Sequence, residues 1–181
     1  MKTKSVQKLS IAALLIALGI IIPMFSPIRI VMEPASFTLA SHVAIFLAMM
    51  ISPTIAIAVV AGTTIGFFFG GFPVIIVLRA ATHLVFASVG AFYLQRHPDI
   101  FRAPVRLRIF SLLLGLLHAL CECAVVAPFY FVGSMDGRGF VHSVLLLVGF
   151  GSVIHSMIDF EISLVVYKVL NHQKGFRAMI Q

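Results

Sequence analysis

The chain has 181 residues, of which 61% are hydrophobic and only 10% are charged, against about 45–50% and about 25% in an ordinary soluble domain. These figures exclude a disordered chain, a coiled coil and a secreted disulfide scaffold. With a mean hydropathy of +1.12, a chain of this size would leave too much apolar surface in contact with water. The composition therefore predicts an all-α integral membrane protein.

The apolar segments predict a bundle of six membrane-spanning helices that forms one domain over residues 1–181. A spanning helix needs about 20 mostly apolar residues. Proline favours the first turn of a helix, so Pro53 and Pro73 mark two of the predicted starts. Gly149 and Gly151 are points where the last, overlong helix can bend. The predicted helices are 10–27, 37–51, 53–69, 73–94, 108–131 and 140–170.

The basic residues predict that both termini are cytoplasmic. The net charge is +7, but the basic residues lie in short segments between apolar runs and form no stripe that would bind nucleic acid. If the N-terminus is inside, the inner segments carry ten Lys and Arg residues, and the outer loops carry only Arg29 and Arg138. This bias is typical of a multi-pass protein whose termini face the cytoplasm.

Arg79 is a cation inside the fourth predicted helix, roughly 9 Å below its outer end. Its guanidinium stays charged, and burying it costs at least about 2.5 kcal/mol unless it finds a partner. We expect it to bind a carboxylate or phosphate of a ligand. A structural pair with Glu122, or snorkelling to the outer surface, is the alternative. His83 lies four residues further along the same helix face, where it could add a hydrogen bond.

Two further pairs repeat this four-residue spacing. His118 and Glu122 share a face of the fifth predicted helix, at a depth close to that of Arg79, where they either shape a pocket or hold helices together. His155 and Asp159 share a face of the sixth, and we interpret them as interhelical hydrogen-bonding residues, with a proton relay as the alternative. HExxH and similar metal motifs are absent from the sequence, so we predict neither a metal nor a cofactor.

More polar residues gather near the outer end of the second predicted helix. Glu33 lies in the loop before that helix, and Thr38 and His42 follow it. Together with Arg79 they predict a pocket that is reached from outside the cell. The sequence has no GxxxxGK motif followed by Ser or Thr, so the chain cannot hydrolyse ATP by that route.

Ala13 and Ala17 form a small-xxx-small pair in the first predicted helix, which lets another helix approach closely. The stretch AALLIA over 12–17 is similar to the first-helix motif of the substrate-binding S components of energy-coupling factor (ECF) vitamin transporters. The stretches PASFTLASH at 34–42, ISP at 51–53, GFP at 71–73 and VLRA at 77–80 also resemble this family.

The resemblance implies an S component in the bacterial cell membrane. Such a subunit binds a vitamin on the outer side, docks on a shared transmembrane coupling subunit with two ATPases, and topples to release the vitamin inside. Ala13 and Ala17 would then face the coupling subunit. The expected substrate-binding residues are Arg79, His83, Glu33, Thr38, His42, Glu122 and His118.

The expected substrate is a small vitamin that carries a carboxylate, because Arg79 suits such a group. Niacin is favoured and pantothenate is next, since the membrane segments offer few amide side chains and the chain has 17 phenylalanines to pack against a ring. The alternatives are a stand-alone proton-coupled carrier that uses His155 and Asp159, and an intramembrane lipid hydrolase that uses Arg79, His118 and Glu122. We predict no enzymatic activity.

Overall fold

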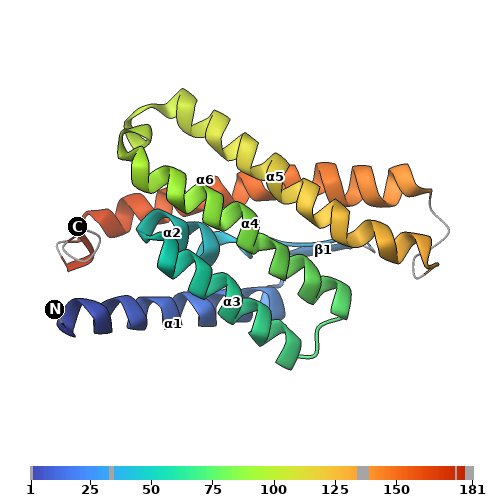
Figure 1. Cartoon of the computed structure of the whole chain (residues 1–181), viewed down its shortest axis with the longest axis horizontal. Coiled ribbons are helices and arrows are strands. Elements are labelled where there is room, and N and C mark those ends of the chain that lie inside the picture. The colour runs from blue at the N-terminus through green and yellow to red at the C-terminus, as the bar shows by residue number, and fades with distance from the viewer. Residues whose placement is uncertain (1, 33–34, 134–138, 174, 178–181) are drawn as a thin grey trace.

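The computed structural model describes residues 2–32, 35–133, 139–173 and 175–177 (Figure 1). Six α-helices dominate it, together with a two-stranded hairpin and two short helices of other types. The elements are α1 (Lys2–Phe25), β1 (Arg29–Met32), β2 (Ala35–Thr38), α2 (Val43–Ile51), α3 (Pro53–Phe69), α4 (Val74–Arg96), a 3-10 helix (Pro98–Arg102), α5 (Pro104–Phe131), a π-helix (Val141–Phe150) and α6 (Gly151–Asn171).

Four described segments are long and apolar enough to cross a membrane: Ser5–Phe25, Val74–Arg96, Pro104–Phe131 and Val141–Asn171. α3 is an apolar helix of 17 residues, and α2 has only 9 residues, about 14 Å of helix, which is under half the thickness of a hydrocarbon core. The start of α1 and the end of α6 lie at the same end of the molecule (Figure 1).

The outer surface carries many large apolar side chains, while the interior combines an apolar core with a few buried charged and polar groups. Large apolar side chains such as Leu14, Leu120 and Val165 are exposed on the outer faces of α1, α5 and α6. Charged and polar side chains, among them Arg79 and Glu122, are buried between the helices. This distribution is the one expected of a bundle whose surroundings are lipid.

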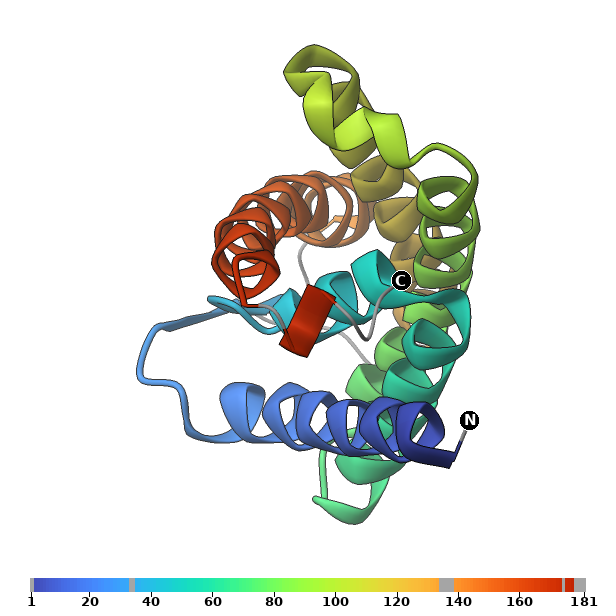
Figure 2. The same ribbon diagram turned by 90° about the vertical axis from the view of Figure 1, so that its left-hand side faces the viewer.

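α2 lies at the centre of the bundle. Every residue from Val43 to Met50 is buried, and the helix contacts α1, α3, α4 and α6. The end-on view shows α2 between α1 and α6 (Figure 2). The chain then turns directly into α3, whose first turn is capped by the Ser52 hydroxyl, which accepts a hydrogen bond from the Ile55 N–H at 3.2 Å.

The hairpin is the main departure from the predicted elements. The sequence predicts a helix over 37–51, but Ala35–Thr38 is a strand that pairs with Arg29–Met32 in antiparallel register, Arg29 opposite Thr38. Residues 39–42 form a turn and the helix begins only at Val43. The predicted second helix is therefore wrong over its first six residues.

Asp159 of α6 fixes this turn from the far end of the sequence. Its carboxylate accepts hydrogen bonds from the Ala40 N–H at 2.8 Å and the His42 N–H at 2.9 Å. Ala40 has a φ of +67°, a left-handed conformation that costs energy in a non-glycine residue. Because Asp159 accepts from the N–H groups of Ala40 and His42, it holds the strained turn and sets where α2 starts.

We expect Asp159→Ala to lower the melting temperature measured in detergent by several degrees. The substitution leaves two backbone N–H groups without their acceptor, at about 1–3 kcal/mol each, and a chain of this size loses about 2–4 °C per kcal/mol. Glu161→Ala is the matched control, because the Glu161 carboxylate is half exposed and pairs with exposed Arg108 at 3.4 Å. Equal melting temperatures for the two variants would contradict the anchoring role of Asp159.

Candidate functional site

A cavity of about 580 Å³ opens among the hairpin, α2, α3, α4, α5 and α6. Its volume lies within the range of about 300–1,000 Å³ that small-molecule sites occupy. The polar part of its wall comes from the hairpin and its turn, and from four of the surrounding helices. The polar lining residues are Arg29, Ser36, Thr38, Ser41, His42, Thr63, Arg79, His83, Glu122 and His155.

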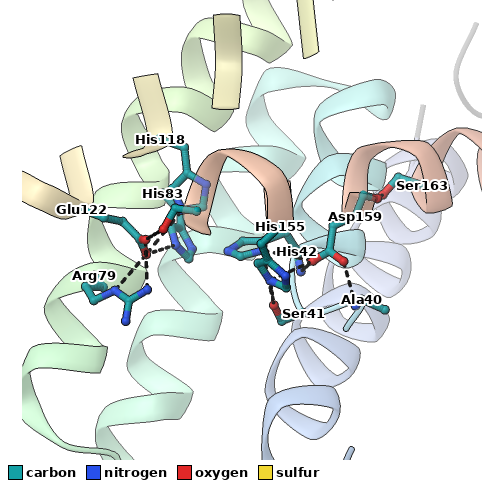
Figure 3. Close-up of polar contacts among 11 residues, drawn as sticks. Ala40, Ser41, His42, Arg79, His83, His118, Glu122, His155, Asp159 and Ser163 are labelled. Atoms are coloured by element: carbon teal, nitrogen blue, oxygen red, sulfur yellow. Dashed lines mark hydrogen bonds and ion pairs between the residues drawn. The ribbon is translucent and has the colours of Figure 1, made fainter. Parts of the chain in front are cut away.

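Arg79 and Glu122 form a buried ion pair in this wall (Figure 3). Arg79 Nε donates to Glu122 Oε1 at 3.1 Å, and Arg79 Nη2 donates to Oε2 at 3.0 Å. The Ser152 hydroxyl also donates to Oε2. Two parallel N–H bonds to one carboxylate fix the guanidinium plane. The pair holds α4 against α5 and at the same time places both charges at the cavity.

Three histidines pack beside this pair. The ring centroids of His42, His83 and His118 are 4.7, 4.8 and 4.8 Å apart, and all three side chains are buried. His83 Nε2 lies 3.5 Å and His118 Nε2 lies 3.4 Å from Glu122 Oε1, although neither contact has hydrogen-bond geometry. The rings come from the turn before α2, from α4 and from α5, so this cluster ties three segments together.

A fourth histidine extends the row across to α6. The His155 ring centroid is 4.9 Å from that of His42, and His155 Nε2 lies 3.0 Å from the Ser41 hydroxyl oxygen. His42 Nδ1 lies 3.1 Å from Asp159 Oδ2. Figure 3 shows the two carboxylates at opposite ends of this row of imidazoles.

Another part of the wall is apolar and aromatic. Phe37 of β2, Phe67 of α3 and Phe72 of the α3–α4 connection line the cavity. The rings of Phe67 and Phe72 stack with centroids 4.5 Å apart and planes inclined by 22°. A flat apolar ligand would pack against such faces while its polar group reached the charged side of the cavity.

One curated protein matches nearly the whole chain. The niacin transporter NiaX of Lactococcus lactis subsp. cremoris (strain MG1363) is 42% identical over 171 residues, which cover 94% of this chain and 77% of the relative. The chain belongs to the NiaX family. No family model and no solved structure matches it.

Membership of the NiaX family confirms the resemblance to niacin-type S components. It also bears out the prediction that the chain is not an enzyme, because the relative is a transporter; the lipid-hydrolase alternative is thereby dropped. Together with the long apolar helices, it makes the chain a helical multi-pass membrane protein.

Most of the expected binding residues of this NiaX-family chain lie together. Five of them line the cavity, namely Thr38, His42, Arg79, His83 and Glu122. His118 does not line it, but its ring packs directly behind those of His42 and His83. Glu33 lies outside the described residues.

Sequence reasoning assigned His155 and Asp159 to interhelical hydrogen bonds and missed the place of His155 in the cavity wall. It placed His155 and Asp159 on one face of the sixth predicted helix, apart from His42 at the outer end of the second. In the structure the turn before α2 brings His42 into contact with both residues. The four-residue spacing of the pair was the available signal. Arg29 and Thr63 also line the cavity, and Thr63 had no signal of its own in the sequence.

The expected partner face of α1 is exposed. Ala13 and Ala17 are both exposed, whereas Ala12, Leu15 and Gly19 are buried against the bundle. The Gly19 backbone passes so close to α3 that an added Cβ would lie 2.7 Å from the Thr63 hydroxyl oxygen. The small residues of α1 thus fall into two groups, one used for packing within the chain and one left on the outer surface.

Proposed function

We propose that this NiaX-family chain is the S component of an ECF transporter, which captures nicotinate at an outward-facing pocket and delivers it to the cytoplasm. The transmembrane coupling subunit and the two ATPases would be separate chains. The name of the relative supports the vitamin, and the resemblance of the quoted motifs supports the partners.

The charge of the cavity wall carries this proposal. Among the described lining residues, Arg29 and Arg79 are positive and only Glu122 is negative, so the wall has a surplus cation. A carboxylate that enters the cavity would meet a guanidinium already held in place by Glu122. The entropy cost of ordering that side chain on binding would therefore be small. Imidazoles and hydroxyls beside the pair can hydrogen-bond the remaining polar atoms of the ligand, and the phenylalanines can cover its ring.

We expect the purified chain in detergent to bind nicotinate at least tenfold more tightly than nicotinamide in a calorimetric titration. The two molecules share a pyridine ring, but the amide cannot form charge-assisted hydrogen bonds, which are worth about 1.5–3 kcal/mol. Pantothenate belongs in the same panel as a larger carboxylate. Equal affinity for nicotinate and nicotinamide would contradict recognition by charge.

Reconstitution of the purified chain in liposomes distinguishes an S component from a stand-alone proton-coupled carrier. An S component alone in liposomes should bind nicotinate without accumulating it under a pH gradient. The structure favours the S component, because Asp159, the acid that such a relay needs, already accepts two backbone hydrogen bonds in the turn before α2. Accumulation driven by a pH gradient alone would overturn the S-component assignment.

A further inference from the structure

The three clustered histidines have the arrangement of a metal site. Three imidazoles on one zinc ion, each bound at about 2.0–2.1 Å, place their ring centroids roughly 5 Å apart. The centroids of His42, His83 and His118 form a nearly equilateral triangle with sides of 4.7, 4.8 and 4.8 Å. One ring nitrogen from each lies within 4.8 Å of the others, so the rings would have to close by up to about 1.5 Å to share one ion at the usual bond length.

The ring nitrogens of this cluster are short of hydrogen-bond partners. His118 is 1% exposed, and neither of its ring nitrogens has a hydrogen bond; His83 Nε2 has none either. A buried polar group without a partner costs about 1–3 kcal/mol, and inside a membrane bundle water offers little relief. A bound cation would satisfy these lone pairs.

Each histidine also has a carboxylate beside it. Asp159 Oδ2 lies 3.1 Å from His42 Nδ1, and Glu122 Oε1 lies 3.5 and 3.4 Å from Nε2 of His83 and His118. At His42 the Asp159 contact leaves Nε2 as the lone-pair donor, which is the usual support of a metal-bound histidine. The Glu122 contacts of His83 and His118 lack hydrogen-bond geometry, so Glu122 adds a negative charge beside the ion and does not fix which ring nitrogen binds it.

The net charge of the buried side chains also favours a bound cation. The buried charged side chains among the described residues are Arg79, Glu122 and Asp159, which sum to one surplus negative charge when the histidines are neutral. An uncompensated charge is costly in this setting. A divalent cation at the histidines would lie between the two carboxylates and offset that surplus.

We propose that His42, His83 and His118 form a binding site for a divalent transition metal, with Zn²⁺ as the best-fitting ion. Three neutral imidazoles suit zinc, and a tetrahedral ion on three protein ligands keeps a fourth position open. His42 and His83 line the cavity, so the site lies at the cavity wall. The second possible group, His42, His155 and Asp159, is less suited, because Asp159 already accepts backbone hydrogen bonds and His155 contacts Ser41. The site does not depend on the proposed vitamin.

The test measures metal binding without any vitamin present. The full chain, purified in detergent through a tag that contains no histidine, is stripped with a chelator and titrated with Zn²⁺ against a fluorescent competitor. In parallel it is loaded with Co²⁺ and its visible absorption is recorded. We expect one ion per chain and the intense d–d bands of tetrahedral cobalt, lost when zinc is added. Absence of stoichiometric zinc binding by the wild type would overturn the proposal.

Variants locate the ion. We expect His118→Asn to weaken zinc binding at least a hundredfold and to abolish the cobalt bands, since even an outer partner of a metal ligand is worth 10–100-fold. His97→Asn is the matched control, because His97 is exposed beyond the end of α4 and should leave both signals unchanged. Should His118→Asn bind zinc like the wild type while His155→Ala loses it, the ion would belong to the second group and the assignment would be wrong.

Discussion

Arg79→Met is expected to bind nicotinate at least tenfold more weakly than the wild type in a calorimetric titration. The substitution removes the guanidinium but keeps an unbranched side chain of similar reach. The loss of a charge-assisted hydrogen bond of about 1.5–3 kcal/mol accounts for a decrease of this size. The melting temperature should fall as well, because Glu122 is left as a buried carboxylate without its cation, at a cost of about 3–5 kcal/mol.

A double variant separates the two effects. Arg79→Met combined with Glu122→Leu removes both charges, and an apolar replacement of a complete buried ion pair is often neutral or stabilising. We expect its melting temperature to return toward that of the wild type while nicotinate binding stays weak. If the double variant bound nicotinate normally, the pair would serve only to join α4 and α5.

An exposed ion pair supplies the control for this series. Arg108 and Glu161 join α5 to α6 at 3.4 Å, with 72% and 51% of their side chains exposed. Arg108→Met should leave both affinity and melting temperature nearly unchanged, because exposed pairs contribute about 0–1 kcal/mol.

Ala13→Trp and Ala17→Trp are expected to abolish nicotinate uptake by cells that express the whole transporter. Both alanines lie on the exposed face of α1, where an indole would keep a partner helix from close approach. Because this face does not line the cavity, nicotinate affinity of the purified variants should equal that of the wild type.

The matched control for the docking face is Val165→Trp, which adds an equally large side chain to the exposed surface of α6. It should support normal uptake. Wild-type uptake by both alanine variants, with normal amounts of protein in the membrane, would show that α1 does not dock through these residues.

The helices were predictable where their signal is local. α3 occupies the predicted 53–69, and α4 begins and ends within two residues of the predicted 73–94, because proline and glycine punctuate long apolar runs there. The hairpin was not predictable. Residues 35–42 mix apolar and polar side chains and contain neither glycine nor proline to mark a turn. The groups that hold the turn belong to Asp159, 117 positions beyond His42.

The candidate site, too, was predictable only in part. The sequence alone singled out Arg79, because a permanent cation in an apolar helix is costly wherever that helix packs, and it showed three pairs at four-residue spacing, each confined to one helix face. Only the tertiary structure decided which of those faces meet. Glu122 became the partner of Arg79, and histidines from four segments came together, because of how the helices pack and because of the turn before α2. The residue spacing within any single segment does not predict either arrangement.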